Sequence, residues 1–292
     1  MSSDYQLLDF GDNEKLESFG GAVVRRQTPS AAGLQSDNTE VKEKWNQSDL
    51  QFHLDFQAYQ GKSKHEKGKW LGEAPDPWRT NICGSTFSLR QTPTGQVGVF
   101  PEQASNWNWI ANLPDRMQGM KALNLFAYTG GTTMALARKG VEVVHVDAAK
   151  SVVSWARENA KLSGLAEAPI RWIVEDVMTF MQRELKRGNG YDIVVADPPS
   201  FGRGPKKELW KIQSDLRPML DLLAALTASQ PNLLLLSCHT PGVDHPMLDR
   251  IANSCFNKSI KSKSTTESFE LSIQSESGKS LPSGSCVRWF DL

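Results

Sequence analysis

An apolar segment that runs into a glycine turn constrains the fold of this chain more than any other feature. Residues 122–126 have the composition of a buried strand, and the next five residues read Ala-Tyr-Thr-Gly-Gly. A helix is predicted over 132–139, and a second apolar strand over 141–146 leads into Asp147. A strand, a glycine turn, a helix and an acid-ended strand in this order are typical of the ligand-binding half of an open α/β sheet.

The residue sequence of the turn limits the class of ligand that it can bind. It lacks the Gly-x-Gly-x-x-Gly spacing that cradles a pyrophosphate. Its glycines let a ligand approach the backbone closely because they have no Cβ. Asp147 is placed to accept hydrogen bonds from ribose hydroxyls. The pattern therefore favours a ligand that contains adenosine but no phosphates, and S-adenosylmethionine is the candidate that fits.

The alternation of strands and helices continues to the end of the chain. Strands are predicted over 170–174, 191–196 and 233–236, and helices over 150–162, 177–187 and 209–229. Strands that are apolar throughout indicate a parallel sheet covered by helices on both faces. Two strand-like segments, 268–273 and 285–290, predict an antiparallel hairpin that closes the sheet.

We therefore predict an α/β fold with a Rossmann-like domain over residues 111–292. Its sheet is expected to have seven strands, most of them parallel. A small β unit and the segment that leads into the cofactor pocket are expected over 79–110. Residues 1–78 are expected to form a small β-rich accessory region, with a short strand at 22–24 and a loop over 27–46.

Charge and cysteine usage limit the functional classes. The 33 basic and 33 acidic residues give a formal net charge of zero. A protein that wraps duplex nucleic acid usually has a basic excess, so any nucleic-acid contact must be local. The four cysteines form no Cys-x-x-Cys pair, which argues against a zinc site and a disulfide framework. Without a basic and apolar leader or a membrane-length apolar run, we expect a reduced, cytoplasmic protein that binds no metal.

Polar residues follow four of the predicted strands. Asp147, Asp176, Asp197 and Cys238 come at the ends of the second to the fifth strand. In an open parallel sheet, ligands bind outside the carboxyl ends of the strands. Asp176 is expected near the adenine amino group, with a helix N-cap as the equally weighted alternative. After Asp197, two prolines predict a rigid turn beside the reactive methyl group, because they fix φ and remove N–H donors.

Cys238 has two interpretations. As a nucleophile, its thiolate would add to carbon 6 of a pyrimidine and so make carbon 5 able to accept a methyl group. Asp197 would then protonate nitrogen 3 of the base. As a core residue, Cys238 would be a small apolar filler at a strand end. His239 is either a base in the same reaction or a structural residue.

Two basic segments can be interpreted either as solvent-exposed loops without a role or as functional loops. The segment 201–207 is either a surface loop or a substrate clamp, in which Phe201 stacks on a flipped base and Arg203 contacts phosphates. The segment 61–69 is either a solvated loop or a phosphate-contacting loop.

With these motifs, the chain resembles the class I S-adenosylmethionine-dependent methyltransferases over residues 95–292. Within them it is similar to the group that contains the large-subunit (23S) ribosomal RNA cytosine-C5 methyltransferases. The segments that carry the resemblance are 97–103, 124–131, 197–201, 237–239 and 281–289. The chain departs from the pattern at Ala104, where the group has Arg, and at Ser200, where it has Lys. An upstream RNA-binding PUA domain is not recognisable.

The resemblance implies a methyltransferase of ribosomal RNA that uses S-adenosylmethionine and methylates cytosine C5, with Cys238 and Asp197 as catalytic residues. The implied cofactor contacts are Phe100, Gln103, Asn124, Phe126, Tyr128, Thr129, Gly130, Asp147, Asp176, Asp197 and Pro198. The substrate contacts expected from the residues themselves are Pro199, Phe201 and Arg203. Three alternatives remain: N-methylation of an RNA base, methylation of a protein or small molecule, and a non-catalytic RNA-binding assembly factor on the same scaffold.

Overall fold

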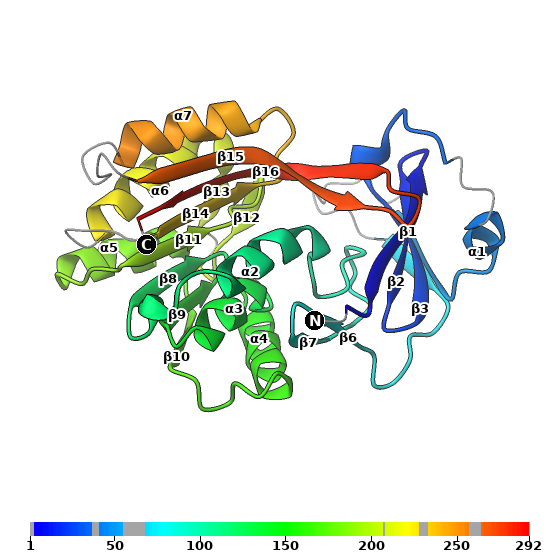
Figure 1. The fold of residues 1–292 in the computed structure, drawn as a ribbon, viewed down its shortest axis with the longest axis horizontal. Coiled ribbons are helices and arrows are strands. Elements are labelled where there is room, and N and C mark those ends of the chain that lie inside the picture. Colours follow the sequence, from blue (N-terminus) through cyan, green and yellow to red (C-terminus); the bar gives the residue numbers. More distant parts are fainter. Residues whose placement is uncertain are drawn as a thin grey trace. The chain divides into compact units, whose positions relative to one another are not determined.

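The computed structural model describes residues 3–36, 41–54, 68–206, 208–227, 233–256 and 264–291 (Figure 1). The chain forms two compact units. The first unit comprises Met1–Ala104 with Ser272–Ser283, and the second comprises Ser105–Leu271 with Gly284–Leu292. The first unit therefore takes up the whole predicted accessory region, most of the predicted small β unit and a short piece of the C-terminal hairpin.

The described part of the first unit contains a five-stranded sheet with the order β1-β2-β3-β4-β5. Its strands are β1 (Tyr5–Gly11), β2 (Glu14–Phe19), β3 (Ala22–Gln27), β4 (Leu50–Leu54) and β5 (Gly68–Leu71). A separate hairpin joins β6 (Arg79–Ile82) and β7 (Ser85–Ser88). The short helices are η1 (Pro29–Ala31), α1 (Lys42–Asn46) and η4 (Pro101–Gln103).

The predicted N-terminal β-rich region is confirmed, but residues 1–46 contain three strands where only one, at 22–24, was expected. Strands β1 to β3 form an antiparallel meander closed by two-residue turns. Asp12 and Asn13 have φ of 50° and 66°, and Gly20 and Gly21 have φ of 58° and 90°. Positive φ at both central residues is the mark of the tight turns that join adjacent β-strands. The Gly-Gly and Asp-Asn pairs were therefore the sequence signals for this meander.

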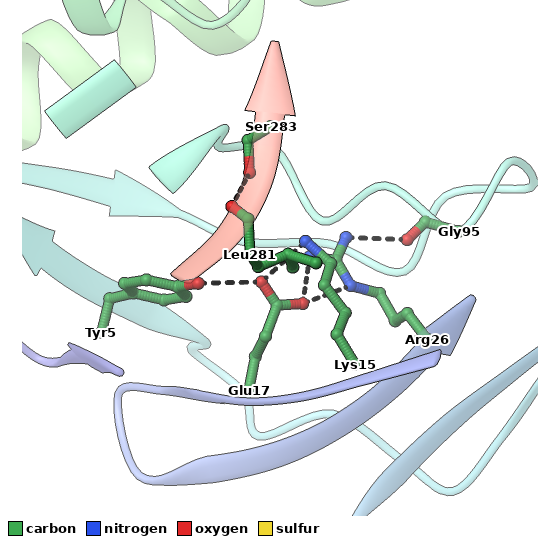
Figure 2. A network of polar contacts seen from close by, with 7 residues as sticks. All are labelled: Tyr5, Lys15, Glu17, Arg26, Gly95, Leu281 and Ser283. Carbon is green, nitrogen blue, oxygen red and sulfur yellow. Dashed lines mark hydrogen bonds and ion pairs between the residues drawn. The ribbon is translucent and has the colours of Figure 1, made fainter. Parts of the chain in front are cut away.

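A buried ionic network lies on the β1–β3 meander (Figure 2). Glu17 is fully buried and accepts hydrogen bonds from Arg26 Nε at 2.9 Å and from Tyr5 Oη at 3.1 Å. Lys15 Nζ lies 3.0 Å from the same carboxylate, and Arg26 also donates to the carbonyl of Gly95 at 3.0 Å. One buried carboxylate thus pairs with the buried Arg26 and with the partly exposed Lys15, and these contacts connect three strands of the sheet.

The described part of the second unit contains a seven-stranded sheet with the order β10-β9-β8-β11-β14-β16-β15. Strands β8 (Lys121–Leu125), β9 (Glu142–Asp147), β10 (Ile170–Val174), β11 (Ile193–Ala196) and β14 (Leu233–Cys238) are parallel. Strand β16 (Ser280–Phe290) pairs antiparallel with β14, and β15 (Thr265–Gln274) flanks it. The predicted Rossmann-like sheet and its C-terminal hairpin are confirmed.

Helices cover both faces of this sheet (Figure 1). On one face, α5 (Val177–Lys186), α6 (Ile212–Leu226) and α7 (His245–Phe256) share a buried core with alternate residues of β11 and β14. On the other face lie α3 (Gly131–Arg138) and α4 (Lys150–Leu162). Helix α2 (Ala104–Ala111) and the short η5 (Asp115–Met117) precede the first strand. Each crossover places a strand end and a helix start at the same edge of the sheet.

The predicted helix over 209–229 begins later, at Ile212. Residues before it form a two-stranded antiparallel hairpin of β12 (Phe201–Arg203) and β13 (Leu209–Lys211). The reason is the burial of Trp210, whose indole N–H donates to the carbonyl of Pro199 at 2.6 Å. This contact holds residues 209–211 in an extended conformation, so the helix cannot start before Ile212.

Candidate cofactor and acceptor site

The turn after β8 is held in an unusual backbone conformation. Phe126 and Tyr128 have φ of 53° and 47°, in the left-handed region that bulky side chains rarely adopt. The N–H of Tyr128 donates to Asp147 Oδ2 at 3.0 Å, and the N–H of Ala149 donates to Oδ1 at 3.0 Å. Asp147 thus fixes the turn from the end of the neighbouring strand β9. Burial raises the pKa of Asp147, and these backbone N–H groups oppose the shift.

The glycines of the turn are required by packing as well as by backbone conformation. A Cβ on Gly131 would lie 2.1 Å from the indole of Trp107. Gly130 has φ of 90° and packs against Ala156, which lies on α4. The indole N–H of Trp107 donates to Thr132 Oγ1 at 3.1 Å. The turn is therefore enclosed by α2 and α4. The missing side chain of Gly131 leaves space for the Trp107 indole, in addition to letting a ligand come close to the backbone.

A buried polar chain supports the turn from below. Asn124 donates through Nδ2 to Thr133 Oγ1 at 2.9 Å, and Thr133 Oγ1 lies 2.9 Å from His145 Nδ1. Burial, helped by the charge of Arg157, lowers the pKa of His145 to about 3, so the ring is neutral. Asn159 donates to the carbonyl of Thr129 at 3.0 Å. Asn124, predicted to contact the cofactor, thus uses its side-chain amide to fasten α3 to the sheet.

Asp176 is the N-cap of helix α5, which was one of its two predicted roles. Its Oδ1 accepts a hydrogen bond from the N–H of Thr179 at 2.9 Å, and its backbone is extended, as at a helix N-cap. The contact of Asp176 with adenine stays a prediction.

The loops after β11 and β14 are fastened to each other. Asp197 Oδ1 lies 3.2 Å from His239 Nε2, and Ser200 Oγ lies 2.8 Å from Thr240 Oγ1. The parallel pairing of Ala196 with Leu236 brings the two strand ends side by side. The sequence motifs at 197–200 and 237–240 therefore form one edge, as predicted, and the His239 ring lies beside the carboxylate of Asp197.

Cys238 lies at this edge but is fully buried. It shares a side of β14 with Leu234 and Leu236, since side chains alternate along a strand. On β16, the residues opposite those two leucines are Trp289 and Val287, and all five belong to the core beneath α6 and α7. The Cys238 thiol therefore packs on the side of the sheet that faces these helices.

The sequence reasoning missed two residues of this region. Trp210 packs its ring 4.9 Å from that of Phe126, and so links the cofactor turn to Pro199 and to the β12–β13 hairpin. Cys286 on β16 donates through Sγ to Asn106 Oδ1 at 3.4 Å. Burial raises the pKa of Cys286 to about 12, which makes its thiol unreactive at neutral pH. The alternation of Leu209, Trp210 and Lys211 was the one signal for the hairpin.

The remaining predicted residues fall into two groups. Pro198 is buried, whereas Pro199, Phe201 and Arg203 are exposed along the same edge loop and β12. Phe100 and Gln103 belong to the first unit, at the start of η4 and within it. The basic segment 61–69 lies outside the described residues except for its last two.

Over the described ranges, no group of three His, Cys, Asp or Glu side chains could hold a metal ion. No described helix is long and apolar enough to cross a membrane.

Comparisons with known proteins agree with this geometry. The sequence profile of the S-adenosylmethionine-dependent methyltransferases matches residues 36–253. A SAM-dependent methyltransferase from Agrobacterium tumefaciens has a solved structure that is 33% identical, with a TM-score of 0.85 over 99% of this chain and 91% of that one. A methyltransferase solved in complex with SAH, 19% identical, has a TM-score of 0.72 over 98% of this chain and 75% of its own and shares the fold.

Curated relatives have names that refer to ribosomal RNA. "Ribosomal RNA large subunit methyltransferase K/L" of Shewanella frigidimarina is 26% identical over 70% of this chain and 26% of its own length. "Ribosomal RNA large subunit methyltransferase I" of Aeromonas hydrophila is 32% identical over 47% of this chain and 35% of its own. The chain thus spans about a quarter to a third of the length of these two relatives.

Proposed function

We propose that this chain, which belongs to the family of S-adenosylmethionine-dependent methyltransferases, methylates a base of ribosomal RNA. When bound, S-adenosylmethionine supplies an electrophilic methyl group on a sulfonium. The names of the curated relatives support ribosomal RNA as the acceptor. One observation carries the proposal. Asp197 and His239 lie beside each other at the ends of β11 and β14, and β11 is the neighbour of β8, the strand that leads into the glycine turn.

The turn is proposed to hold the cofactor through Asp147. Its carboxylate already accepts from two backbone N–H groups, and carboxylate oxygens keep further lone pairs for a ribose hydroxyl. Phe126, Tyr128, Thr129 and Gly130 would form the wall of the pocket by their backbone. The other predicted cofactor contacts stay predictions.

Replacing Asp147 with alanine is expected to weaken S-adenosylmethionine binding about 10- to 150-fold, because hydrogen bonds to a charged group contribute about 1.5–3 kcal/mol. Asp147→Asn should weaken it less, since its side-chain carbonyl can still accept from Tyr128. Calorimetric titration with the cofactor measures both. Asp192→Ala is the matched control, because Asp192 accepts from the N–H of Lys121 at the opposite edge of the sheet. Equal affinities in Asp147→Ala and the control would contradict the ribose role.

The finer proposal is methylation at cytosine C5. Cys238 Sγ would form a bond to carbon 6 while Asp197 gives a proton to nitrogen 3. Carbon 5 would then take the methyl group as the bond from that group to the sulfonium sulfur breaks. A base would then remove the carbon 5 proton as the carbon–sulfur bond breaks and releases the thiolate. The position of Cys238 at the end of β14, next to the strand that leads into Asp197, supports this reaction. The thiol would have to turn from its buried position to reach the base.

A second candidate, methylation of a base nitrogen, is favoured by the burial of Cys238. An amino nitrogen needs no covalent activation. It needs an acceptor for its proton and a rigid polar edge to hold it, and Asp197 with the two prolines that follow would supply both.

RNA that carries 5-fluorocytosine distinguishes the two reactions. Under C5 methylation, fluorine takes the place of the proton that must leave, so the wild-type protein is expected to stay covalently attached to the RNA. Cys238→Ala should form no adduct and lose methyl transfer. Cys286→Ala, which removes a second buried thiol on the adjoining strand, should still form it. Full activity of Cys238→Ala without any wild-type adduct would assign the reaction to nitrogen.

The whole function is tested in cells. Ribosomal RNA from a deletion strain, mapped by mass spectrometry and bisulfite sequencing, is expected to lack one methyl group. An unchanged methylation map would overturn the proposal that ribosomal RNA is the acceptor.

A further inference from the structure

We propose that the outward face of the β12–β13 hairpin binds an unpaired segment of the RNA, with one base stacked on Phe201 and phosphates held by Arg203 and Lys211. The inference rests on the proposed function, and it specifies the form of RNA that the acceptor edge receives. We call the four residues Phe201, Arg203, Leu209 and Lys211 the hairpin face.

The pairing register puts these four side chains on one side of the hairpin. Phe201 pairs with Lys211, and Arg203 pairs with Leu209. Residues directly opposite each other share a face, and residues two apart along a strand do so as well. The burial agrees, because all four are exposed whereas Trp210, between two of them, is buried.

The other side of the hairpin anchors it to the second unit. Trp210 donates to the carbonyl of Pro199 at 2.6 Å and packs on Phe126. The N–H of Gly204 donates to the carbonyl of Glu208 at 2.9 Å, which closes the turn. The hairpin face is therefore carried on a fixed support that connects directly to the Asp197-Pro198-Pro199 edge.

The hairpin face is apolar and positive at the same time. Phe201 is 39% exposed and Leu209 51%, and they are two of the seven large apolar side chains that the described residues expose. Over the described ranges, no hydrogen bond or ion pair engages the side chain of Arg203 or Lys211. The nearest carboxylates in sequence, Glu208 and Asp215, accept from the backbone N–H groups of Lys206 and Lys211.

This combination fits single-stranded nucleic acid. An exposed aromatic ring flanked by cations binds a base through its face and the backbone through its phosphates. Side chains two apart on a strand are about 6.6 Å from each other, so Arg203 can reach a phosphate beside a base on Phe201. A base in a duplex already stacks on its neighbours, and it must be unpaired to stack on Phe201. An acidic peptide would use the two cations but would leave the ring without a partner.

The test is the binding of a short fluorescent single-stranded RNA oligomer, measured by anisotropy over a salt series. Phe201→Ala is expected to weaken binding roughly 5- to 150-fold, the range for one base stacked on an aromatic ring, and to leave the salt dependence unchanged. Arg203→Ala and Lys211→Ala should each reduce the slope of log K against log salt by about 0.7, the value for one phosphate of a single strand.

Matched controls lie on α5, where Leu185 and Lys186 are also exposed. Leu185→Ala and Lys186→Ala should bind the oligomer as the wild type does. A duplex of the same sequence should bind more weakly and should not respond to Phe201→Ala. Since all five substituted side chains are exposed, each variant is expected to melt near the wild-type temperature.

Three results would overturn the inference: unchanged RNA affinity in Phe201→Ala, unchanged salt slopes in both cation variants, or tighter binding of an acidic peptide than of RNA. The proposed function fails separately. A wild-type protein that methylates ribosomal RNA while Phe201→Ala binds the oligomer normally refutes the hairpin face alone. A deletion strain with an unchanged methylation map refutes the acceptor assignment, whatever the oligomer shows.

Discussion

Replacing Asp197 with asparagine is expected to lower the rate of methyl transfer about 10²- to 10⁴-fold, the range that a positioned acid–base group contributes. The side chain follows β11 directly, and its Oδ1 lies 3.2 Å from His239 Nε2. Asparagine has nearly the same shape, but it has no charge and takes up no proton at neutral pH. Both candidate reactions need that carboxyl group, because C5 addition requires its protonated form to give a proton to nitrogen 3 and N-methylation requires its ionised form as a proton acceptor.

The matched control is Asp192→Asn, at the opposite end of the same strand. Asp192 accepts from the N–H of Lys121 at 2.9 Å, and asparagine can still accept there. Single-turnover rates at saturating cofactor separate the chemical step from binding. If Asp197→Asn and Asp192→Asn transfer the methyl group at the same rate, Asp197 takes no part in the chemistry.

The central sheet could be predicted from the sequence because its strands are apolar throughout. Val194, Val195 and their neighbours leave no polar alternation, and only a parallel sheet buried on both faces suits such segments. The order of motifs then placed Asp147 and Asp197 at strand ends. Both are found there, and Asp147 fixes the turn that opened the prediction.

The direction of the Cys238 thiol could not be predicted from that same pattern. Both faces of β14 are apolar. The sequence from Leu233 to Leu236 therefore does not indicate which alternate residues face the helices on one side of the sheet and which face those on the other. The direction follows only from the pairing with β16 and from the helices that pack there. A residue that ends a strand can therefore be assigned to an edge by sequence, but not to a face.

The missed strands share a different cause. Strands β12 and β13 have three residues each, so the single alternation of Leu209, Trp210 and Lys211 is too short to distinguish a strand from the start of a helix, and the strands are fixed by the burial of one tryptophan. In β2, the charged residues Lys15 and Glu17 look like a solvent-exposed segment. Glu17 is buried because its carboxylate pairs with Lys15 and with Arg26, which lies on another strand, and Lys15 stays partly exposed.

Replacing Glu17 with alanine is expected to destabilise the first unit by about 3–5 kcal/mol, because it leaves the buried Arg26 and the partly exposed Lys15 without a counter-charge. The Glu17 side chain is 0% exposed, and those of Arg26 and Lys15 are 9% and 14% exposed. Tyr5 would also lose the acceptor of its hydroxyl (Figure 2). Hydrogen exchange of the β1–β3 amides under increasing denaturant measures the loss within this unit.

Glu14→Ala is the matched control for the charge. Glu14 lies on the same strand and pairs with Arg25 Nη2 at 2.6 Å, but both side chains are partly exposed. A pair in contact with water contributes about 0–1 kcal/mol, so Glu14→Ala should change the stability little. Equal losses of stability in the two variants would show that burial does not determine how much the Glu17 network stabilises the protein.

The acid dependence separates charge from packing in the Glu17 variant. Burial by itself raises the pKa of Glu17, but Arg26 and Lys15 outweigh it and hold the pKa below the usual value. A carboxylate with a lowered folded-state pKa contributes stability above its unfolded pKa of about 4.3 and loses it as the pH falls through the folded value. The stability gap between wild type and Glu17→Ala should therefore narrow below about pH 4. A gap that stays constant to acid would mean that the lost contribution is the packing of the side chain and that the charge contributes nothing.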